Sequence, residues 1–350
     1  MSAKLRKPEL KRAPCSGRRR AAYVSQEKLV TTRPFDAART LPLVVEPAVE
    51  GLDLIAWAAN NRDFIKACLL ECGAMLFRGF EPGGVEAFTE FIKATSDGEL
   101  LAYTNRSTPR TEVGGNIYTA TEYPANQVIP LHNENSYQRS WPRKLYFFCA
   151  TAPQQGGATP LADSRRVFER LRPEIRERFA RKKVMYVRNY GDGLDLPWQS
   201  VFQTTDKAEV EAFCRRAGLE FEWKGDDRLR TRQVCQAVAR HPETGRMVWF
   251  NQAHLFHVSA LEPTVRQYLL AEFKEQDLPR NAFYGDGTSI EEPLLDEIRQ
   301  AYNDEMVTFA WQPADILLLD NMLAAHARES FAGPRRILVG MSETFQNEHL

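Results

Sequence analysis

The chain has 350 residues, which is enough for one large domain or two ordinary ones. Its 46 basic and 46 acidic residues balance, which excludes a global charge bias towards nucleic acid or a membrane surface. There is neither a signal-peptide core nor a run of about 18 apolar residues. We therefore expect a cytoplasmic protein that has no membrane span and no nucleic-acid partner.

The N-terminal segment differs from the rest in charge. Residues 1–20 contain eight Lys or Arg residues and a single Glu. They carry no interleaved aromatic residues and precede no DNA-binding pattern, so a solvated tail is favoured over a nucleic-acid-binding arm. We predict a disordered basic arm at residues 1–33 and one folded domain at residues 34–350. The six cysteines lack paired CxxC spacing, which fits reduced thiols.

The first part of the domain predicts a sheet with helices packed on one side. A strand is expected at 41–47, a helix at 52–72 ended by Gly73, a strand at 74–80 and a second helix at 85–96. Residues 101–130 follow as a polar, aromatic segment rich in turn residues, of the kind that often contacts substrate. Its substrate-binding candidates are Asn105, Arg106, Asn116 and Tyr118, although an ordinary surface loop explains each of them equally well.

The remaining elements are mostly short strands. They are expected at 144–150, 183–188, 219–223, 247–252, 308–311, 315–320 and 337–341, with helices at 207–217, 263–278 and 290–302. Ser164 is predicted to cap a further helix that contains Val167, Leu171 and Ile175. This mixture predicts a β-rich α+β domain, built either as a barrel or as a double sheet.

A candidate metal site begins with His132 and Glu134. Apolar residues arrive at this point, and alternate side chains of an extended strand share one face. His132 and Glu134 are therefore expected to point towards one ion while Asn133 points away. With only six histidines in the chain, His326 is the natural third ligand, since it follows the apolar strand at 315–320. Two histidines and a carboxylate leave open positions on ferrous iron, as in non-haem iron oxygenases.

Two arginines follow His326 before the last strand. A 2-oxo acid that occupies two of the open positions has a distal carboxylate, which an arginine binds through paired hydrogen bonds. Arg335 and Arg336 are the candidates. Taken singly, each residue favours a structural explanation: His326 as a core histidine, and the two arginines as a solvated pair. The combined order of these residues favours the metal site.

The chain resembles the 2-oxoglutarate-dependent iron oxygenases of the taurine dioxygenase and clavaminate synthase type from about residue 40 onwards. The matching motifs are Leu-His132-Asn-Glu134, Gly156-Gly-Ala-Thr159-Pro, and Asp320 to His326 followed by Gly-Pro-Arg335-Arg336. The resemblance implies a double-stranded β-helix, the jelly-roll or cupin-like core, with flanking helices and a helical insertion. It implies that His132, Glu134 and His326 bind Fe(II). Thr159 and Arg336 would hold 2-oxoglutarate, with Arg335 as the alternative to Arg336.

Two departures from the family pattern bear on the reaction. The metal carboxylate is Glu, as in the clavaminate synthase branch, and related halogenases replace this carboxylate with a small residue. Its presence therefore favours hydroxylation or desaturation, with O2 as the second co-substrate. Taurine dioxygenase binds the substrate sulfonate through an arginine four residues after the co-substrate arginine. Counted from Arg336, that position is Gly340, which argues against a sulfonate substrate.

A narrower resemblance concerns the substrate. Phrases around Arg106, Asn116, His132 and Trp249 are similar to the branch near the syringomycin-pathway aspartyl hydroxylase. That branch implies an amino acid attached to an acidic carrier protein in natural-product biosynthesis, and the basic arm with Arg106 and Arg110 would steer the carrier. Gln252, His254 and His257 are further substrate-side candidates, with structural packing as the alternative for the two histidines.

Three functions remain open on the sequence. The first is hydroxylation of a carrier-bound amino acid, coupled to decarboxylation of 2-oxoglutarate. The second is hydroxylation or desaturation of a free amino acid. The third, from another class, is a non-catalytic binding or regulatory protein on the same scaffold.

Overall fold

The core of the protein is built on one large sheet. The computed structural model describes residues 29–102, 110–121, 123–191, 196–225 and 227–347. Eight strands lie side by side; β2 and β3 run parallel, and the other neighbouring strands run antiparallel. In spatial order they are β1 (Val30–Pro34), β2 (Leu43–Pro47), β3 (Ala74–Phe77), β16 (Ile316–Asp320), β7 (Ser140–Thr151), β19 (Arg336–Gln346), β5 (Ile117–Thr119) and β4 (Glu112–Gly114).

A smaller sheet packs against this large one. It contains β6 (Ile129–His132), β17 (Ala324–Arg328) and β9 (Leu161–Asp163). A separate short pair is formed by β8 (Gln155–Gly156), which precedes β9, and β18 (Phe331–Ala332), which follows β17. One buried cluster joins the two sheets, with Phe147 and Val339 from the large sheet and Leu161 and Ala324 from the small one. Two facing, mainly antiparallel layers form the predicted jelly-roll-like core.

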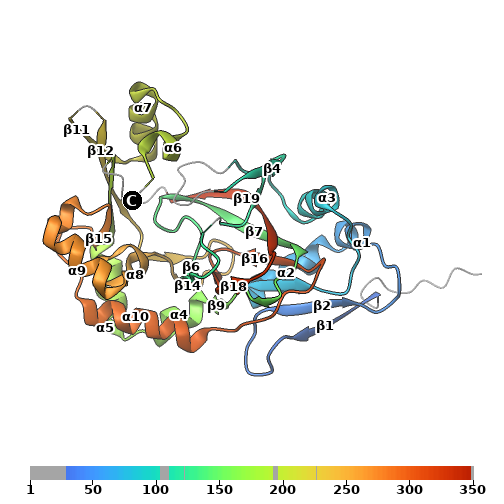
Figure 1. Cartoon of the computed structure of the whole chain (residues 1–350). Helices are drawn as coiled ribbons and strands as arrows, with labels where there is room; N and C mark the ends of the chain where they lie inside the picture. Colours follow the sequence, from blue (N-terminus) through green and yellow to red (C-terminus); the bar gives the residue numbers. More distant parts are fainter. Residues whose placement is uncertain (1–28, 103–109, 122, 192–195, 226, 348–350) are drawn as a thin grey trace, which may run out of the picture.

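Three N-terminal helices cover the outer face of the large sheet (Figure 1). They are α1 (Leu54–Asn60), α2 (Arg62–Cys72) and α3 (Val85–Thr95). Trp57 of α1 and Phe91 of α3 pack with Phe77 of the sheet, and each fully buried side chain of this size stabilises the fold by roughly 1.5–3 kcal/mol. The helix expected at 52–72 is divided at Asn61, and Gly73 ends it with φ +81° as predicted.

A large insertion lies on the opposite side of the core from α1–α3 (Figure 1). It carries the four-stranded antiparallel sheet β11-β12-β10-β15 as well as helices, so the helical insertion expected from the sequence is a mixed one. Its helices are α4 (Ser164–Arg170), α5 (Pro173–Lys182), α6 (Trp198–Phe202), α7 (Lys207–Ala217), α8 (Ala253–Phe256), α9 (Pro263–Glu272) and α10 (Glu292–Glu305). Its strands are β10 (Val184–Tyr190), β11 (Glu220–Lys224), β12 (Arg228–Cys235), β13 (Val238–Arg240), β14 (Met247–Trp249) and β15 (Arg280–Tyr284).

Several predicted boundaries need correction. The folded domain begins before residue 34, because β1 starts at Val30 and pairs with β2; residues 1–28 lie outside the described part. Asp163, not Ser164, caps α4 through its side chain, and α4 ends before α5 begins. Residues 308–311 form no strand, although Phe309 and Trp311 are buried there.

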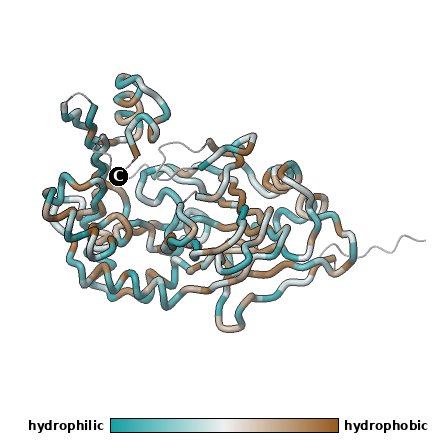
Figure 2. The backbone as a smooth tube through the Cα atoms, in the orientation of Figure 1, coloured by the Kyte–Doolittle hydropathy of each residue, from teal (hydrophilic) through white to brown (hydrophobic). Residues whose placement is uncertain are grey.

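The helices are amphipathic rather than uniformly apolar. In Figure 2, α10 alternates between hydrophilic and hydrophobic residues, as expected for a helix with one buried face. Within the described ranges, none of the helices has the length and apolar character needed to cross a membrane.

Candidate metal centre

His132 ends strand β6, and the chain turns immediately after it. The turn is stabilised by Asn133, whose side-chain amide donates to Ser164 Oγ at 2.9 Å and to the carbonyl of Asn321 at 2.7 Å. Asn133 therefore points away from the face that carries His132 and Glu134. The alternation expected from an extended chain explains this arrangement.

His326 lies directly opposite His132, because β17 pairs with β6 in that register. The two imidazole rings are 4.4 Å apart between centroids. Ligand atoms of His132, Glu134 and His326 all lie within 4.8 Å of one another. The structure thus brings together the three residues that the sequence nominated, from strands far apart along the chain.

The protonation of both histidines suits a metal. Burial lowers the pKa of His132 and lowers that of His326 well below its usual value, so both rings are neutral near pH 7. The Nδ1 atom of His132 lies 2.8 Å from the carbonyl oxygen of Pro130, so a proton on Nδ1 leaves the Nε2 lone pair free for a metal. Two neutral imidazoles and one carboxylate fit a divalent iron site.

A cation also lies at this centre. Arg110 Nη2 donates to Glu134 Oε2 at 2.8 Å, and both side chains are 4% exposed. The surface role that the sequence suggested for Arg110, steering a partner protein, is excluded by this burial.

The backbone of the metal motif is held from several sides. Asn321 accepts from the Glu134 amide at 2.7 Å and donates to the Glu134 carbonyl at 2.9 Å. Gln252 donates to the carbonyl of Asn133, and His254 Nε2 lies 3.0 Å from the carbonyl of Leu131. The insertion therefore supplies contacts that position the metal strand.

The substrate-side candidates divide into three groups. Asn105 and Arg106 lie outside the described residues. Tyr118 is buried in the inter-sheet core and donates to Asn116, which adopts φ +63° in the turn before β5. Gln252, His254 and His257 are buried in the insertion, where Gln252 and His254 contact backbone carbonyls and His257 caps a short helical turn at Ser259. These contacts support the packing interpretation of the two histidines.

The three residues expected to bind 2-oxoglutarate differ in burial and in contacts. Thr159 is buried and its hydroxyl accepts from Trp311 Nε1 at 2.9 Å. Arg335 donates from Nε to the carbonyl of Gly157 at 3.0 Å, beside the same turn, whereas Arg336 is exposed at the start of β19. The structure therefore brings Arg335 next to the turn that carries Thr159, and not Arg336.

Arg335 and Arg328 form a pair of cations around one ring. Their guanidinium carbons lie 5.4 and 5.3 Å from the centroid of Phe331. Burial, together with Arg328, lowers the pKa of Arg335 to about 10. No carboxylate in the described part of the chain forms an ion pair with either residue, so an anion would be favoured here.

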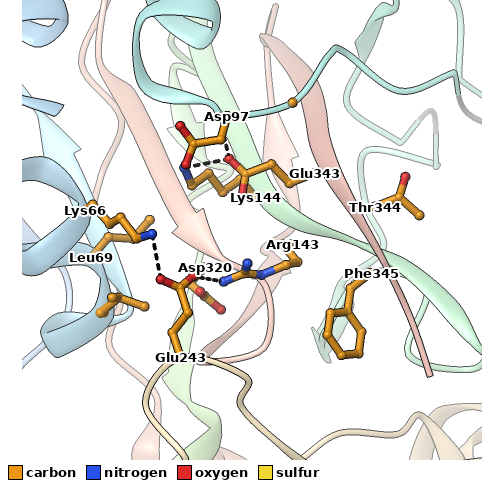
Figure 3. Close-up of a pocket in the computed structure, with 12 residues that line it drawn as sticks. Lys66, Leu69, Asp97, Arg143, Lys144, Glu243, Asp320, Glu343, Thr344 and Phe345 are labelled. Carbon is orange, nitrogen blue, oxygen red and sulfur yellow. Dashed lines mark hydrogen bonds and ion pairs between the residues drawn. The ribbon is translucent and has the colours of Figure 1, made fainter. Parts of the chain in front are cut away.

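The cavity shown in Figure 3 lies apart from the metal residues. It measures about 430 Å³, and its lining includes Lys66, Arg143, Glu243 and Glu343 but none of the three metal candidates. Lys66 and Arg143 both pair with Glu243, and Lys144 pairs with Glu343. These three cations of the wall are thus already paired with carboxylates, which makes the cavity a poor match for an anionic substrate.

The chain is similar to known proteins over most of its length. Residues 36–342 match the model of the taurine catabolism dioxygenase TauD, TfdA family. The dapdiamide synthesis protein DdaC of Enterobacter agglomerans is 42% identical over 277 residues, which are 79% of this chain and 84% of DdaC. A clavaminate synthase-like protein of Arabidopsis thaliana is 31% identical over 331 residues, or 91% of this chain and 96% of that one. The crystal structure of PvcB from Pseudomonas aeruginosa shares the fold, with a TM-score of 0.57 at 17% identity, covering 93% of this chain and 97% of PvcB.

Proposed function

Because this chain belongs to the taurine catabolism dioxygenase TauD, TfdA family, and is thus a non-haem iron and 2-oxoglutarate-dependent dioxygenase, we propose that it hydroxylates an amino-acid-derived substrate. The observation that supports this most directly is the convergence of His132, Glu134 and His326. The cations Arg328 and Arg335, which both lie against Phe331, support it further. When bound, iron with 2-oxoglutarate and O2 supplies oxidative decarboxylation to succinate and the oxidising power to attack an unactivated C–H bond.

The residues of the chain have separate tasks. His132, Glu134 and His326 bind the metal, with the histidines neutral because of burial. Arg335 binds the distal carboxylate of 2-oxoglutarate, with Arg328 adding positive charge, and Thr159 contributes its buried hydroxyl. Glu134 would serve as the carboxylate ligand of the metal, and the presence of this carboxylate favours transfer of oxygen over halogenation. Phe147, whose ring centroid lies 5.2 Å from that of His326, helps to exclude water from the reacting C–H bond.

The metal assignment is tested first by binding. Wild-type protein under anaerobic conditions should bind Fe(II) and then 2-oxoglutarate, with a visible charge-transfer band. His132→Ala should lose at least about 100-fold in metal affinity, since one of three protein ligands is removed. The matched control is His257→Asn. This residue lies outside the metal motif, and asparagine keeps an acceptor for the Ser259 amide. Full metal affinity in His132→Ala would overturn the assignment.

We further propose that the amino acid is attached to a carrier protein, in a natural-product pathway of the cytoplasm. The relative DdaC is named for dapdiamide synthesis, and the structural relative PvcB is described as an oxygenase from an isonitrile synthetic pathway. A groove of about 360 Å³ is lined by Asn135, the residue after Glu134, and by Phe213 and Arg216 of α7. A linear arm in such a groove would contact Asn135, next to the metal motif in the sequence. The five described cysteines are free, as a reducing compartment requires.

Carrier dependence has a direct test. Turnover of each free amino acid is compared with that of its thioester on a carrier protein, by succinate formation and by the mass of the amino acid. Arg216→Glu should slow the thioester reaction at least about fivefold, because it repels an acidic carrier and its phosphate-bearing arm. Arg215→Glu on the same helix, where Arg215 pairs with Glu211, is the control. If Arg216→Glu and Arg215→Glu turn over a free amino acid at the same rate, the result contradicts carrier dependence. It would instead favour a free-amino-acid hydroxylase or desaturase.

A further inference from the structure

The turn that follows Glu134 contributes to the wall of a groove. Asn135 and Gln138 of this turn line the groove of about 360 Å³, together with Phe213 and Arg216 of α7. This volume lies within the range of about 300–1,000 Å³ that is typical of small-molecule sites. The groove thus reaches the residue next to the metal carboxylate, although its lining includes none of the three metal candidates.

The backbone of this turn is held by hydrogen bonds. Gln236 of the insertion donates from Nε2 to the carbonyl oxygens of Ser136 and Gln138, at 2.9 and 3.0 Å. The Gln138 amide donates to the Asn135 carbonyl at 2.9 Å. Asn135 has φ +57°, a left-handed conformation that asparagine adopts more readily than most residues. The Cα positions of Asn135 and Gln138 are therefore set before a ligand binds.

The two side-chain carboxamides, in contrast, are not used by the fold. Asn135 Oδ1 and Gln138 Nε2 are buried, and neither atom has a hydrogen-bond partner among the described residues. Asn133 of the same turn differs, because its amide donates to Ser164 and to Asn321. Leaving a buried polar atom unsatisfied is destabilising, and the last torsion of a carboxamide side chain is soft. Asn135 can thus offer an acceptor, and Gln138 a donor, to a ligand in the groove.

One further wall residue has an unpartnered polar atom but a structural explanation. Trp141 Nε1 is buried and has no hydrogen-bond partner in the described part of the chain. The ring centroid of Trp141 lies 4.7 Å from that of Phe250 and 5.2 Å from that of Phe345, within one buried cluster. Trp141 therefore belongs to the core, and the carboxamides of Asn135 and Gln138 remain as the polar groups for a ligand.

The rest of the lining matches a linear ligand with an apolar section and an anionic end. Leu101, Phe213 and Met341 supply apolar surface. Arg139 and Arg216 also line the groove, and its lining within the described ranges includes no Asp or Glu. Arg216 is exposed on α7, where it can attract an anion that arrives from solvent. A free amino acid has no secondary amide to match the two carboxamides.

We propose that the groove binds the phosphopantetheine arm of a carrier protein, and that Asn135 and Gln138 recognise a secondary amide of this arm. The arm is a linear chain that carries secondary amides and a phosphate. Asn135 Oδ1 accepts from the amide N–H, Gln138 Nε2 donates to the amide carbonyl, and Arg216 attracts the phosphate. The inference rests on the proposed function and deepens it, because it names the groups that select a tethered amino acid over a free one.

The test titrates the full chain with S-methylphosphopantetheine and measures binding by calorimetry. The protein is first loaded with Co(II) and N-oxalylglycine, a stable analogue of 2-oxoglutarate, and the S-methyl group prevents the probe from binding the metal as a thiolate. A second probe is methylated on its amide nitrogens and therefore lacks the N–H groups. The wild type should bind the first probe saturably and the second at least about fivefold more weakly, since a hydrogen bond is lost.

Variants of the two carboxamides locate the contact. Asn135→Gly keeps the left-handed backbone and removes the acceptor, so it should bind the first probe at least about fivefold more weakly and no longer distinguish the two probes. Asn135→Asp keeps an acceptor and should still distinguish them. Gln138→Leu should weaken both probes about fivefold, because both contain the amide carbonyl, and it carries the test if Asn135→Gly fails to fold. Gln267→Leu, at an exposed position of α9 outside the groove, should match the wild type.

The possible failures can be told apart. The inference fails if Asn135→Gly and Gln138→Leu bind the first probe as tightly as the wild type, or if the wild type binds both probes equally. Tighter binding of N-acetylglycine than of the first probe would overturn the arm as the ligand, since the recognised amide would then belong to the substrate itself. Absence of Co(II) or N-oxalylglycine binding by the wild type would instead refute the proposed function.

Discussion

The Nε atom of Arg335 donates to the carbonyl oxygen of Gly157 at 3.0 Å, and this contact joins the start of β19 to the turn before Thr159. Arg335→Gln should therefore raise the KM for 2-oxoglutarate about 10- to 100-fold, because a charged hydrogen bond to the distal carboxylate is lost. Arg336→Gln, at an exposed position, should change it less than about twofold. Succinate formation at varied 2-oxoglutarate measures both. A larger effect at Arg336 would reverse the assignment.

Gly157 offers a second way to disturb the same contact. At φ +69°, a Cβ atom would lie 2.8 Å from Pro153 Cγ and 2.9 Å from Phe331 Cβ, so Gly157→Ala adds a clash to the cost of the left-handed backbone. Gly245→Ala is the matched control, because Gly245 has φ +68° with no atom within 4 Å. Urea unfolding should show about 1 kcal/mol lost by the control and at least about 2 kcal/mol lost by Gly157→Ala. A raised KM for 2-oxoglutarate should accompany only the latter.

Asn321 links stability to metal affinity. Its side chain makes hydrogen bonds with the amide and carbonyl of Glu134 and with the carbonyl of Pro142. Asn321→Ala should lower the free energy of unfolding by about 2–4 kcal/mol and weaken Co(II) binding about tenfold, because the turn that presents Glu134 loses its support. Asn281→Ala is the control.

Asn281 is equally buried and accepts from two backbone amides in the insertion, away from the metal motif. The Asn281→Ala variant should lose a similar free energy of unfolding while its affinity for Co(II) stays unchanged. If the two variants bind Co(II) equally well, Asn321 does not position the metal ligand.

Burial of His257 should make the free energy of unfolding depend on pH. Burial, the main cause, lowers its pKa to about 4, below the value of about 6.5 expected for the unfolded chain. Between these values the unfolded state binds the proton more tightly, so stability falls as the pH falls through 6.5. The expected loss from this residue between pH 7.5 and pH 5 is about 2 kcal/mol. His257→Asn keeps the acceptor for the Ser259 amide and should remove that loss. Urea unfolding of metal-free protein at both pH values measures it, and an unchanged difference would contradict it.

The metal residues could be predicted because His132 and Glu134 form a local pattern and because the chain has few histidines. Period-two alternation sets the directions of His132 and Glu134, and a chain with six histidines offers few third ligands. The choice between Arg335 and Arg336 was harder. The pairing of β19 with β7 shifts register between Arg336 and Ile337, and a shift of one residue exchanges the faces of a strand. No pattern in the sequence predicts this register shift.

The surroundings of the site depend on long-range packing and were predicted less well. Arg110 follows a polar segment and was expected at the surface, yet it folds inward onto Glu134. Gln252 and His254 were substrate-side candidates, with packing as the alternative for His254, and they contact the backbone carbonyls of Asn133 and Leu131. The contact of Arg110 with Glu134 spans 24 positions, and the contacts of Gln252 and His254 span more than 100, so none of them follows from local periodicity.

The pairing of His132 with His326 has a consequence for the chain as a polymer. The two ligands lie on adjacent strands but at opposite ends of the segment that contains the whole insertion. A metal bound between them acts as a reversible cross-link that closes this long loop, and cross-links of long loops restrict the unfolded chain most strongly. A single cut by a protease within the insertion would leave two fragments that the metal joins in addition to the pairing of β3 and β7 with β16 and of β7 with β19.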